Sequence, residues 1–377
     1  MIPRVLLRPA RRLAVLLAVM LALQACVTVG PDYEPPAIDW LADWQPDLYG
    51  QLASPDDAFE GDLRFWWLLF DDESLNGLIE IARRENPSLR IAGLRILESR
   101  AALGVAQSGR YPQLQQLGGA ITYVNTQRHG GALDLGDTSL TAYQAAFNVG
   151  WELDFWGRFR RGIESADAVF LASIANHQDV QVLLTAQVVD LYFAYRTTQI
   201  RIDIAKRNAA LQARSLEITR QLYEQGQSSE LDLQQARTQH LSTLATIPAL
   251  EVALTQVRNA LAVLLGRPPG DLPELHGASP NLPALDPVSI QGVPARLLLR
   301  RPDLRGAAWQ AAAQSARIGV AKADLYPAIT LVGSIGWSAD SLSSTADTGT
   351  LAIGPALTWN VFDYGRIRNN VRVQDAR

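Results

Sequence analysis

The chain has 377 residues, 34 of them basic and 38 acidic, and a formal net charge of −4. This acidic balance argues against nucleic acid as a partner, because phosphate backbones attract basic surfaces. A single cysteine cannot form an internal disulfide. The four histidines lack the spacing of a metal site, and no phosphate-binding loop or nucleophile motif is present. The sequence therefore predicts neither an enzyme nor a metal or organic cofactor.

The first 25 residues have the features of an export signal. A basic start precedes an apolar run from Leu13 to Leu23, which is too short for a bilayer span of about 20 residues. The run ends in Leu23-Gln24-Ala25-Cys26, which resembles a bacterial lipobox, so we expect a lipid on Cys26. Val27 after the cysteine suggests sorting to the outer membrane. The competing interpretation is a chance cysteine beside an export signal.

Cleavage before Cys26 deletes four arginines and no acidic residue, which changes the formal charge from −4 to −8. No segment after Cys26 is apolar enough to predict a transmembrane helix. We therefore expect any membrane passage to use a closed barrel, because unpaired backbone groups are not tolerated in lipid.

Two blocks of the sequence occur twice, in the same order and at nearly the same offset. They are Asn86–Arg90 with Tyr111-Pro112, repeated 215 positions later at Arg301–Arg305 with Tyr326-Pro327, and Trp151–Arg158, repeated 208 positions later at Trp359–Arg366. A period this long is not that of a solenoid and indicates a duplicated half-molecule. Each half reads as helix, strand, loop, strand, helix.

Two segments, 113–155 and 328–363, show the period-two alternation of β-hairpins. Large apolar groups alternate with small or polar groups, which suits strands that span a membrane around a water-filled lumen. The residues predicted to face the lumen are Gln144, Asn148, Glu152, Asp154, Thr358 and Asn360. The alternative is a soluble antiparallel sheet with one buried face.

The smallest membrane barrels have about eight strands, so the four strands of one chain cannot close a barrel. Several chains must therefore contribute strands to a single barrel. The residues assigned to the junctions between strands and helices are Pro112, Gly157, Pro327 and Gly365. Glu152 and Asp154 beside one junction predict a mild cation preference of the lumen, although the aligned residues in the second copy are Asn360 and Phe362.

The segment from Arg158 to Gln225 contains no proline and carries apolar residues at helical spacing, which predicts one helix of 68 residues. Gly226 is expected to end it, and Ser228 or Ser229 to cap a return helix that ends at Leu265. Pro248 inside the return helix predicts a kink or a local break. The two helices form a predicted hairpin over 157–266.

The combination of motifs resembles the TolC-like outer-membrane efflux proteins, in particular their lipoprotein subgroup. The motifs that carry the resemblance are Cys26 with Gly30–Pro35, Phe65-Trp66-Trp67, Asn86-Pro87, both Tyr-Pro pairs, both Gly-Arg junctions, Tyr223–Gly226, Ser229, Leu231–Leu233 and Asn259–Gly266. Each motif is weak alone, but together they cover nearly all of residues 21–377.

The resemblance implies the exit duct of a tripartite efflux pump, a passive conduit for drugs, metals or other small molecules that is anchored in the outer membrane and extends into the periplasm. It implies a homotrimer, in which each chain gives four strands to a twelve-stranded barrel that continues into a coiled α-helical tunnel. Its partners would be a periplasmic adaptor, an inner-membrane proton-driven pump and outer-membrane lipid. The residues that match the adaptor-facing hairpin tip are Gly226, Ser229, Glu230, Leu231 and Asp232, some of which also suit plain helix capping. The transported substrate is not encoded in such a duct, because the pump selects the cargo.

The predicted domains are a signal peptide at 1–25, a periplasmic or collar segment at 26–85, a first repeat at 86–266, a collar segment at 267–300 and a second repeat at 301–377. The repeat offset predicts that the second helical hairpin is incomplete, with about 97 residues absent. A polypeptide-secretion conduit and a structural lipoprotein with a coiled stalk are the alternative functions.

Overall fold

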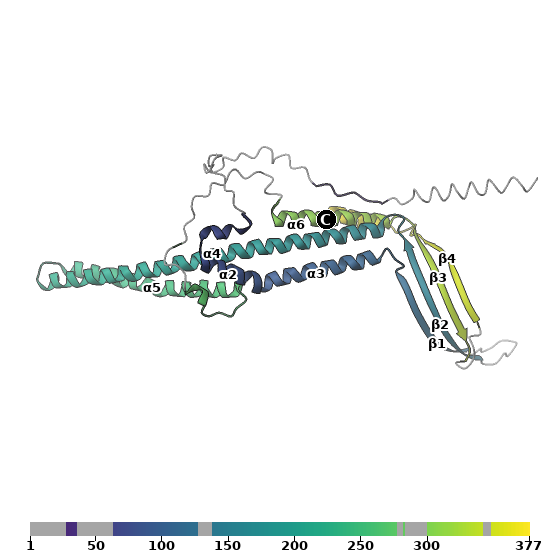
Figure 1. Cartoon of the computed structure of the whole chain (residues 1–377), viewed down its shortest axis with the longest axis horizontal. Coiled ribbons are helices and arrows are strands. Elements are labelled where there is room, and N and C mark those ends of the chain that lie inside the picture. Colours follow the sequence, from purple (N-terminus) through teal and green to yellow (C-terminus); the bar gives the residue numbers. More distant parts are fainter. Residues whose placement is uncertain (1–27, 36–62, 127–137, 277–281, 283–299, 342–347) are drawn as a thin grey trace, which may run out of the picture. The chain divides into compact units, whose positions relative to one another are not determined.

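The computed structural model describes residues 28–35, 63–126, 138–276, 282, 300–341 and 348–377. Its parts form two compact units (Figure 1). Of the described residues, those within 28–35, Ile96–Ser173 and Gly306–Arg377 belong to the first unit, and those within 63–95 and Ile174–Arg305 belong to the second. The predicted signal peptide, the predicted lipid site Cys26, the loops of both β-hairpins (127–137 and 342–347) and large parts of the two predicted collar segments lie outside the described residues.

The first unit contains a four-stranded sheet in the order β1-β2-β3-β4, in which every neighbouring pair is antiparallel. The strands are β1 (Leu114–Thr126), β2 (Thr138–Leu153), β3 (Ala328–Ala339) and β4 (Thr348–Thr358). The two hairpins predicted from the two repeats are thus joined edge to edge, since β2 of the first pairs with β3 of the second.

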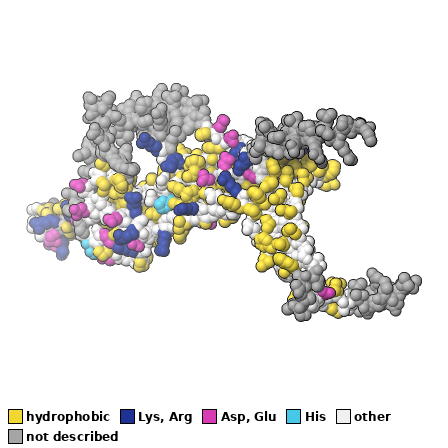
Figure 2. Space-filling model, turned by 45° about the vertical axis from the view of Figure 1, so that its right-hand side comes forward, with side chains coloured by type: hydrophobic (Ala, Val, Ile, Leu, Met, Phe, Trp, Pro, Cys, Tyr) yellow, Lys and Arg dark blue, Asp and Glu magenta, His cyan; other side chains and the backbone are white. Residues whose placement is uncertain are grey.

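The register brings the large apolar positions of all four strands onto one face. Leu117 lies opposite Phe147, Phe147 opposite Ile335, and Ile335 opposite Leu351, so one apolar row crosses the whole sheet. The adjacent row consists of Gly118, Ala146, Gly336 and Thr350. Leu117 and Leu351 are 76% and 77% exposed. Figure 2 shows hydrophobic side chains gathered over the strands, unlike the buried face of a soluble sheet.

The strands end earlier than the alternation suggested. β2 ends at Leu153 and β4 at Thr358, so Asp154 and Asn360 follow the strands instead of belonging to them. Asp154 instead accepts hydrogen bonds from the first turn of the next helix. The ladder between β3 and β4 stops at Ala328 and Thr358 because the preceding residue, Pro327, has no N–H to donate.

The long helix predicted after Gly157 is present as α4 (Arg158–Glu224), a single helix of 67 residues. Alongside the sheet, the first unit contains part of α3 (Pro87–Ser108), part of α4, most of α6 (Pro302–Ala323) and α7 (Arg366–Ala376). Its buried side chains are mostly alanines, among them Ala168, Ala312, Ala313 and Ala316. Small side chains let helix backbones approach closely.

The second unit holds the larger hydrophobic core. It contains η2 (Leu63–Phe70), α2 (Glu73–Glu85), the remainder of α4, α5 (Glu230–Leu264) and η3 (Pro273–Leu275). The fully buried side chains include Leu75, Leu78, Ile79, Val188, Tyr192, Leu261 and Leu265. The Tyr192 hydroxyl donates to Asp72, which also caps α2 through the Leu75 N–H, and this polar pair fixes α2 against α4.

Two expectations about α5 were not met in full. The helix runs through Pro248 without a break. In the part of the chain that the structure describes, α5 is also long and apolar enough to cross a membrane by length and composition alone. The prediction that no such segment follows Cys26 was therefore wrong. A single helix that passes this test is weak evidence for a membrane span.

Candidate channel wall, strand–helix junction and hairpin tip

The small face of the sheet carries four of the six residues predicted to line the lumen. Gln144, Asn148 and Glu152 alternate along β2, and Thr358 ends β4. Asn148 lies opposite Gln116 on one side and Ser334 on the other. The wall is polar without being crowded, because its remaining positions are mostly Gly, Ala, Ser and Thr.

The strand–helix junctions repeat one hydrogen bond in the two halves. The indole N–H of Trp151 donates to the Arg110 carbonyl at 3.2 Å, and the indole N–H of Trp359 donates to the Leu325 carbonyl at 3.1 Å. Trp359 is the repeat counterpart of Trp151, and Leu325 is that of Arg110. The duplication read from the sequence is thus also a duplication of contacts.

A further contact joins the two halves. The ring of Trp156 stacks on Tyr326 with centroids 4.6 Å apart, and its N–H donates to the carbonyl of Pro327 at 2.8 Å. Gly157 and Gly365 open the two helices with φ of +77° and +84°. Only glycine adopts this left-handed conformation without strain. Pro112 and Pro327 lie just before β1 and β3, so all four predicted junction residues lie where strand and helix meet.

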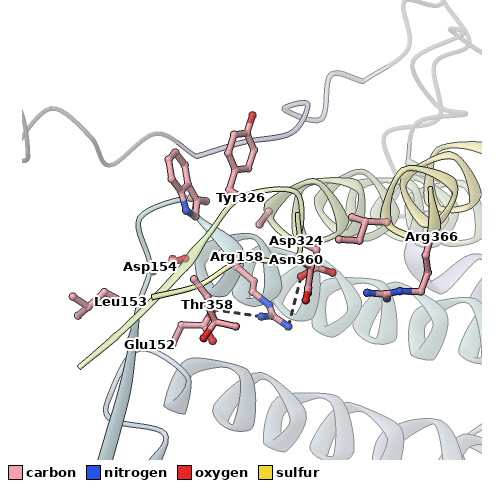
Figure 3. A pocket seen from close by; sticks show the side chains of 13 residues that line it. Glu152, Leu153, Asp154, Arg158, Asp324, Tyr326, Thr358, Asn360 and Arg366 are labelled. Atoms are coloured by element: carbon pink, nitrogen blue, oxygen red, sulfur yellow. Dashed lines mark hydrogen bonds and ion pairs between the residues drawn. The ribbon is translucent and has the colours of Figure 1, made fainter. Parts of the chain in front are cut away.

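A cavity of about 360 Å³ opens at this junction and is lined by charged groups from several elements (Figure 3). Arg158 lies 3.4 Å from Glu152 and 3.8 Å from Asp324, and Arg160 lies 3.3 Å from Asp154. Both carboxylates that predicted a cation preference therefore have arginine partners. Their negative charge is partly compensated, which weakens the predicted preference.

An N-terminal strap, residues 28–35, packs on the same junction. The Val29 N–H donates to the Trp156 carbonyl at 3.1 Å. Arg161, whose side chain is 4% exposed, donates to the carbonyls of Val29 and Gly30 at 3.2 Å each and to the carboxylate of Asp32 at 2.7 Å. Burial lowers the pKa of Arg161, but the hydrogen bonds that its guanidinium donates to Asp32 and Glu164 outweigh this effect and raise the pKa above its ordinary value.

Sequence reasoning missed Arg161. Motif matching noted the Gly30–Pro35 run but gave no residue that binds it. The available signal was an asymmetry of the repeat, because Arg158 and Gly157 recur as Arg366 and Gly365 whereas Arg161 corresponds to Asn369.

The tip of the helical hairpin is closed by two capping motifs. Gly226 has φ of +76°, its N–H donates to Tyr223 and the Gln227 N–H donates to Leu222, which is the Schellman pattern. Ser229 and Asp232 form a reciprocal capping box at the start of α5. Glu230 and Leu231 follow on the first turn, and Leu231 is 65% exposed.

The other end of the hairpin is fixed by Asn86. Its side chain donates to the Leu264 carbonyl at 2.9 Å and accepts from the Leu89 N–H at 3.0 Å. The same side chain thus caps the C-terminal end of α5 and the N-terminal end of α3. Gly266, with φ of +68°, approaches so closely that a Cβ would lie 2.7 Å from the Glu85 carbonyl oxygen. The Asn-Pro motif therefore joins the helical hairpin to α2 and α3.

This arrangement matches known proteins along almost the whole chain. The probable efflux pump outer membrane protein SepC of Pseudomonas putida is 31% identical over 369 residues, covering 94% of this chain and 74% of SepC. The probable outer membrane lipoprotein SilC of Salmonella typhimurium is 31% identical over 359 residues, covering 94% and 75%. The solved structure of the outer-membrane channel OprN superposes with a TM-score of 0.78 at 34% identity, covering 93% of this chain and 77% of OprN.

The family model described as outer membrane efflux protein matches residues 78–267 and 293–377. These ranges include both repeats, the four strands, the junctions and the hairpin tip. The four-stranded sheet and the long helices are those of a TolC-like channel protomer. The chain belongs to the outer membrane efflux protein family.

Proposed function

We propose that three copies of this chain form the outer-membrane exit duct of a tripartite efflux pump. The observation that carries the proposal is the sheet, which has one exposed apolar face, one small and polar face, and β1 and β4 as its two edges. Pairing β1 of one copy with β4 of the next satisfies both edges, and three copies close a ring of about twelve strands. The apolar face then contacts lipid and the small face encloses water.

The long helices continue this wall into the periplasm as a tunnel. The hairpin tip, residues 226–232, is the proposed contact for a periplasmic adaptor, which in turn engages an inner-membrane proton-driven pump. The two caps support this role because they hold the tip in one conformation without using the exposed Leu231 side chain. The duct is passive and transports small molecules or ions that the pump selects.

Cys26 is the proposed site of lipid attachment and holds the N-terminus in the outer membrane. The support comes from the lipobox and from the name of the relative SilC, an outer membrane lipoprotein. The lipid is covalent, and no other prosthetic group is proposed.

A matched pair of variants tests the assignment of the two faces. Leu351 and Ala352 are neighbours on β4 and point to opposite faces. Leu351→Lys places a charge in lipid, which costs about 2–4 kcal/mol near the bilayer centre, whereas Ala352→Lys places the same charge in water. We expect Leu351→Lys to lower the yield of outer-membrane trimers, and Ala352→Lys to insert normally and shift single-channel conductance in planar bilayers. Equal insertion and unchanged conductance for both variants would show that the faces do not differ as proposed.

A further inference from the structure

The two duplicated junctions differ wherever the N-terminal strap touches them. Gly157 has a counterpart in Gly365, but a Cβ at Gly157 would lie 2.7 Å from the Thr28 side chain, whereas at Gly365 the nearest atom is in Asn369 at 3.6 Å. Arg161, which binds the strap, corresponds to Asn369. The second junction thus keeps the turn and lacks the groups that hold a strap.

The closest approach of the strap is between two glycines. A Cβ on Gly30, whose φ is +102°, would lie 2.4 Å from the Gly319 Cα, and a Cβ on Gly319 would lie 2.8 Å from the Val29 carbonyl oxygen. The repeat counterpart of Gly319 is Gly104 in α3, where a Cβ would meet nothing within 4 Å. The missing side chain of Gly319 therefore leaves room for the strap. Among the described residues, no segment packs against Gly104 in the same way.

Charge and packing hold the strap further along. The buried Arg161 guanidinium has two carboxylate partners, Asp32 on the strap and Glu164 on its own helix. Next to it, Tyr33 packs on a floor of Ala168, Ala312 and Ala313. Without the strap, the guanidinium would lose two carbonyl acceptors and one carboxylate acceptor and would keep only Glu164.

We propose that residues 28–35 are an intramolecular tether, with Arg161 as its positioning residue, that holds the lipid-bearing N-terminus beside the strand–helix junction. Thr28 is the first residue of the strap that the structure describes, and Cys26 precedes it by two positions in the sequence. The acyl chains then enter the membrane where the strands end. This location of the lipid rests on the proposed function, but the docking of the strap does not.

The test uses the full-length protein in outer-membrane vesicles, with a nitroxide label on Glu34→Cys, an exposed strap position. The label reports strap motion by electron paramagnetic resonance. We expect the spectrum of the labelled parent to contain a slow-motion component, and we expect Gly319→Ala to remove it. Gly104→Ala makes the same substitution at the repeat counterpart and should leave the spectrum unchanged. Asp32→Ala, at a side chain that is 87% exposed, removes a strap contact without entering the helix packing and should also release the label.

A slow component that survives in both Gly319→Ala and Asp32→Ala, or one that is lost equally in Gly104→Ala, would overturn the tether. The parent without Glu34→Cys separates this result from the lipid proposal, because an acylated Cys26 takes up no label. Label uptake by that parent would refute lipid attachment and with it the location of the lipid. Single-channel conductance of the same samples tests the duct independently, and we expect it to be unchanged in Gly319→Ala.

Discussion

Asp154 and Asp363 cap equivalent helices from positions that do not align. The Asp154 carboxylate accepts from the Phe159 N–H at 3.1 Å, and the Asp363 carboxylate accepts from the Ile367 N–H at 2.7 Å. Phe159 and Ile367 are repeat counterparts, but Asp154 corresponds to Phe362. The two halves have therefore kept a carboxylate at the helix N-terminus while its position in the sequence moved by one residue. Both helices begin against a strand end, where free N–H groups need an acceptor.

The first prediction concerns this capping. Asp154→Ala should lower the free energy of unfolding by about 1 kcal/mol, because the first turn of α4 loses its acceptor. Asp154→Asn should cost less, since an amide oxygen still accepts hydrogen bonds. Thermal unfolding of the detergent-solubilised protein, followed by circular dichroism, measures both. Phe362→Ala, at the exposed counterpart, is the control. An unfolding midpoint for Asp154→Ala equal to that of the parent would contradict the capping role.

The second prediction compares two glycines that end helices. Gly226 and Gly266 both have positive φ, and alanine in this conformation costs about 1–2 kcal/mol. A Cβ on Gly226 meets nothing within 4 Å, whereas one on Gly266 would collide with the Glu85 carbonyl. Gly266→Ala should therefore be the more destabilising variant, measured as the shift of the unfolding midpoint. Equal shifts would mean that the close contact between Gly266 and the Glu85 carbonyl does not exclude a larger side chain at position 266. Gly270→Ala, at an open position without positive φ, is the control.

Local patterns predicted the elements well. The absence of proline between Arg158 and Gln225 gave the 67-residue helix to within one residue, and Gly226 with Ser229 gave the turn at its end. The alternation also gave the two faces of the sheet, because side-chain direction has period two in any strand. These features depend on neighbours in sequence, which a single sequence contains.

Contacts between distant residues were not predictable in the same way. Asp154 continued the alternating pattern of β2 but is held by the helix that follows, so its side chain does not extend the strand. Asn86 was noticed only as part of a motif, and its bond to Leu264 joins residues 178 positions apart. Arg161 has no local signature for this role, because its partners on the strap, the carbonyls of Val29 and Gly30 and the Asp32 carboxylate, lie about 130 positions away in the sequence. The only sign of its role in the sequence is that the second repeat has Asn369 at the position equivalent to Arg161.

The third prediction concerns the pH dependence of the hairpin tip. Hydrogen bonds from the Ser229 hydroxyl and N–H, and from the Ser228 hydroxyl, hold the pKa of Asp232 below its ordinary value. Since the folded pKa is depressed, the stabilisation by the capping box is complete above the ordinary aspartate pKa of about 3.9 and is lost as pH falls through the folded pKa. The tip should keep its conformation from about pH 8 to pH 5 and loosen only below about pH 4.

Fluorescence anisotropy of a dye on Gln227→Cys follows this transition in the full-length protein. The same protein with Asp232→Asn is the control, because it has no carboxylate to titrate and should show no step. A step above about pH 5 in the parent, or an equal step in Asp232→Asn, would assign the transition to another group.

The fourth prediction concerns ion selectivity at the junction cavity. Arg158 lies between Glu152 and Asp324 and is 46% exposed, so it compensates two carboxylates beside the proposed lumen. Arg158→Gln should raise the cation-to-anion permeability ratio, because it leaves both carboxylates without their cation. Glu152→Gln should lower the ratio by removing one of those charges. The reversal potential of single channels in a salt gradient gives the sign of each change.

The control for charge alone is Arg372→Gln, because this arginine is on α7 and is not among the residues that line the cavity. It removes the same charge from the chain, and its reversal potential should equal that of the parent. Screening restricts the influence of exposed charges to about 10 Å at 0.1 M salt, so the effect of Arg158→Gln should shrink as salt rises. If Arg372→Gln shifts the reversal potential as much as Arg158→Gln does, net charge determines the selectivity. If only the junction variants shift it, and in opposite directions, the cavity lies on the path of the ions.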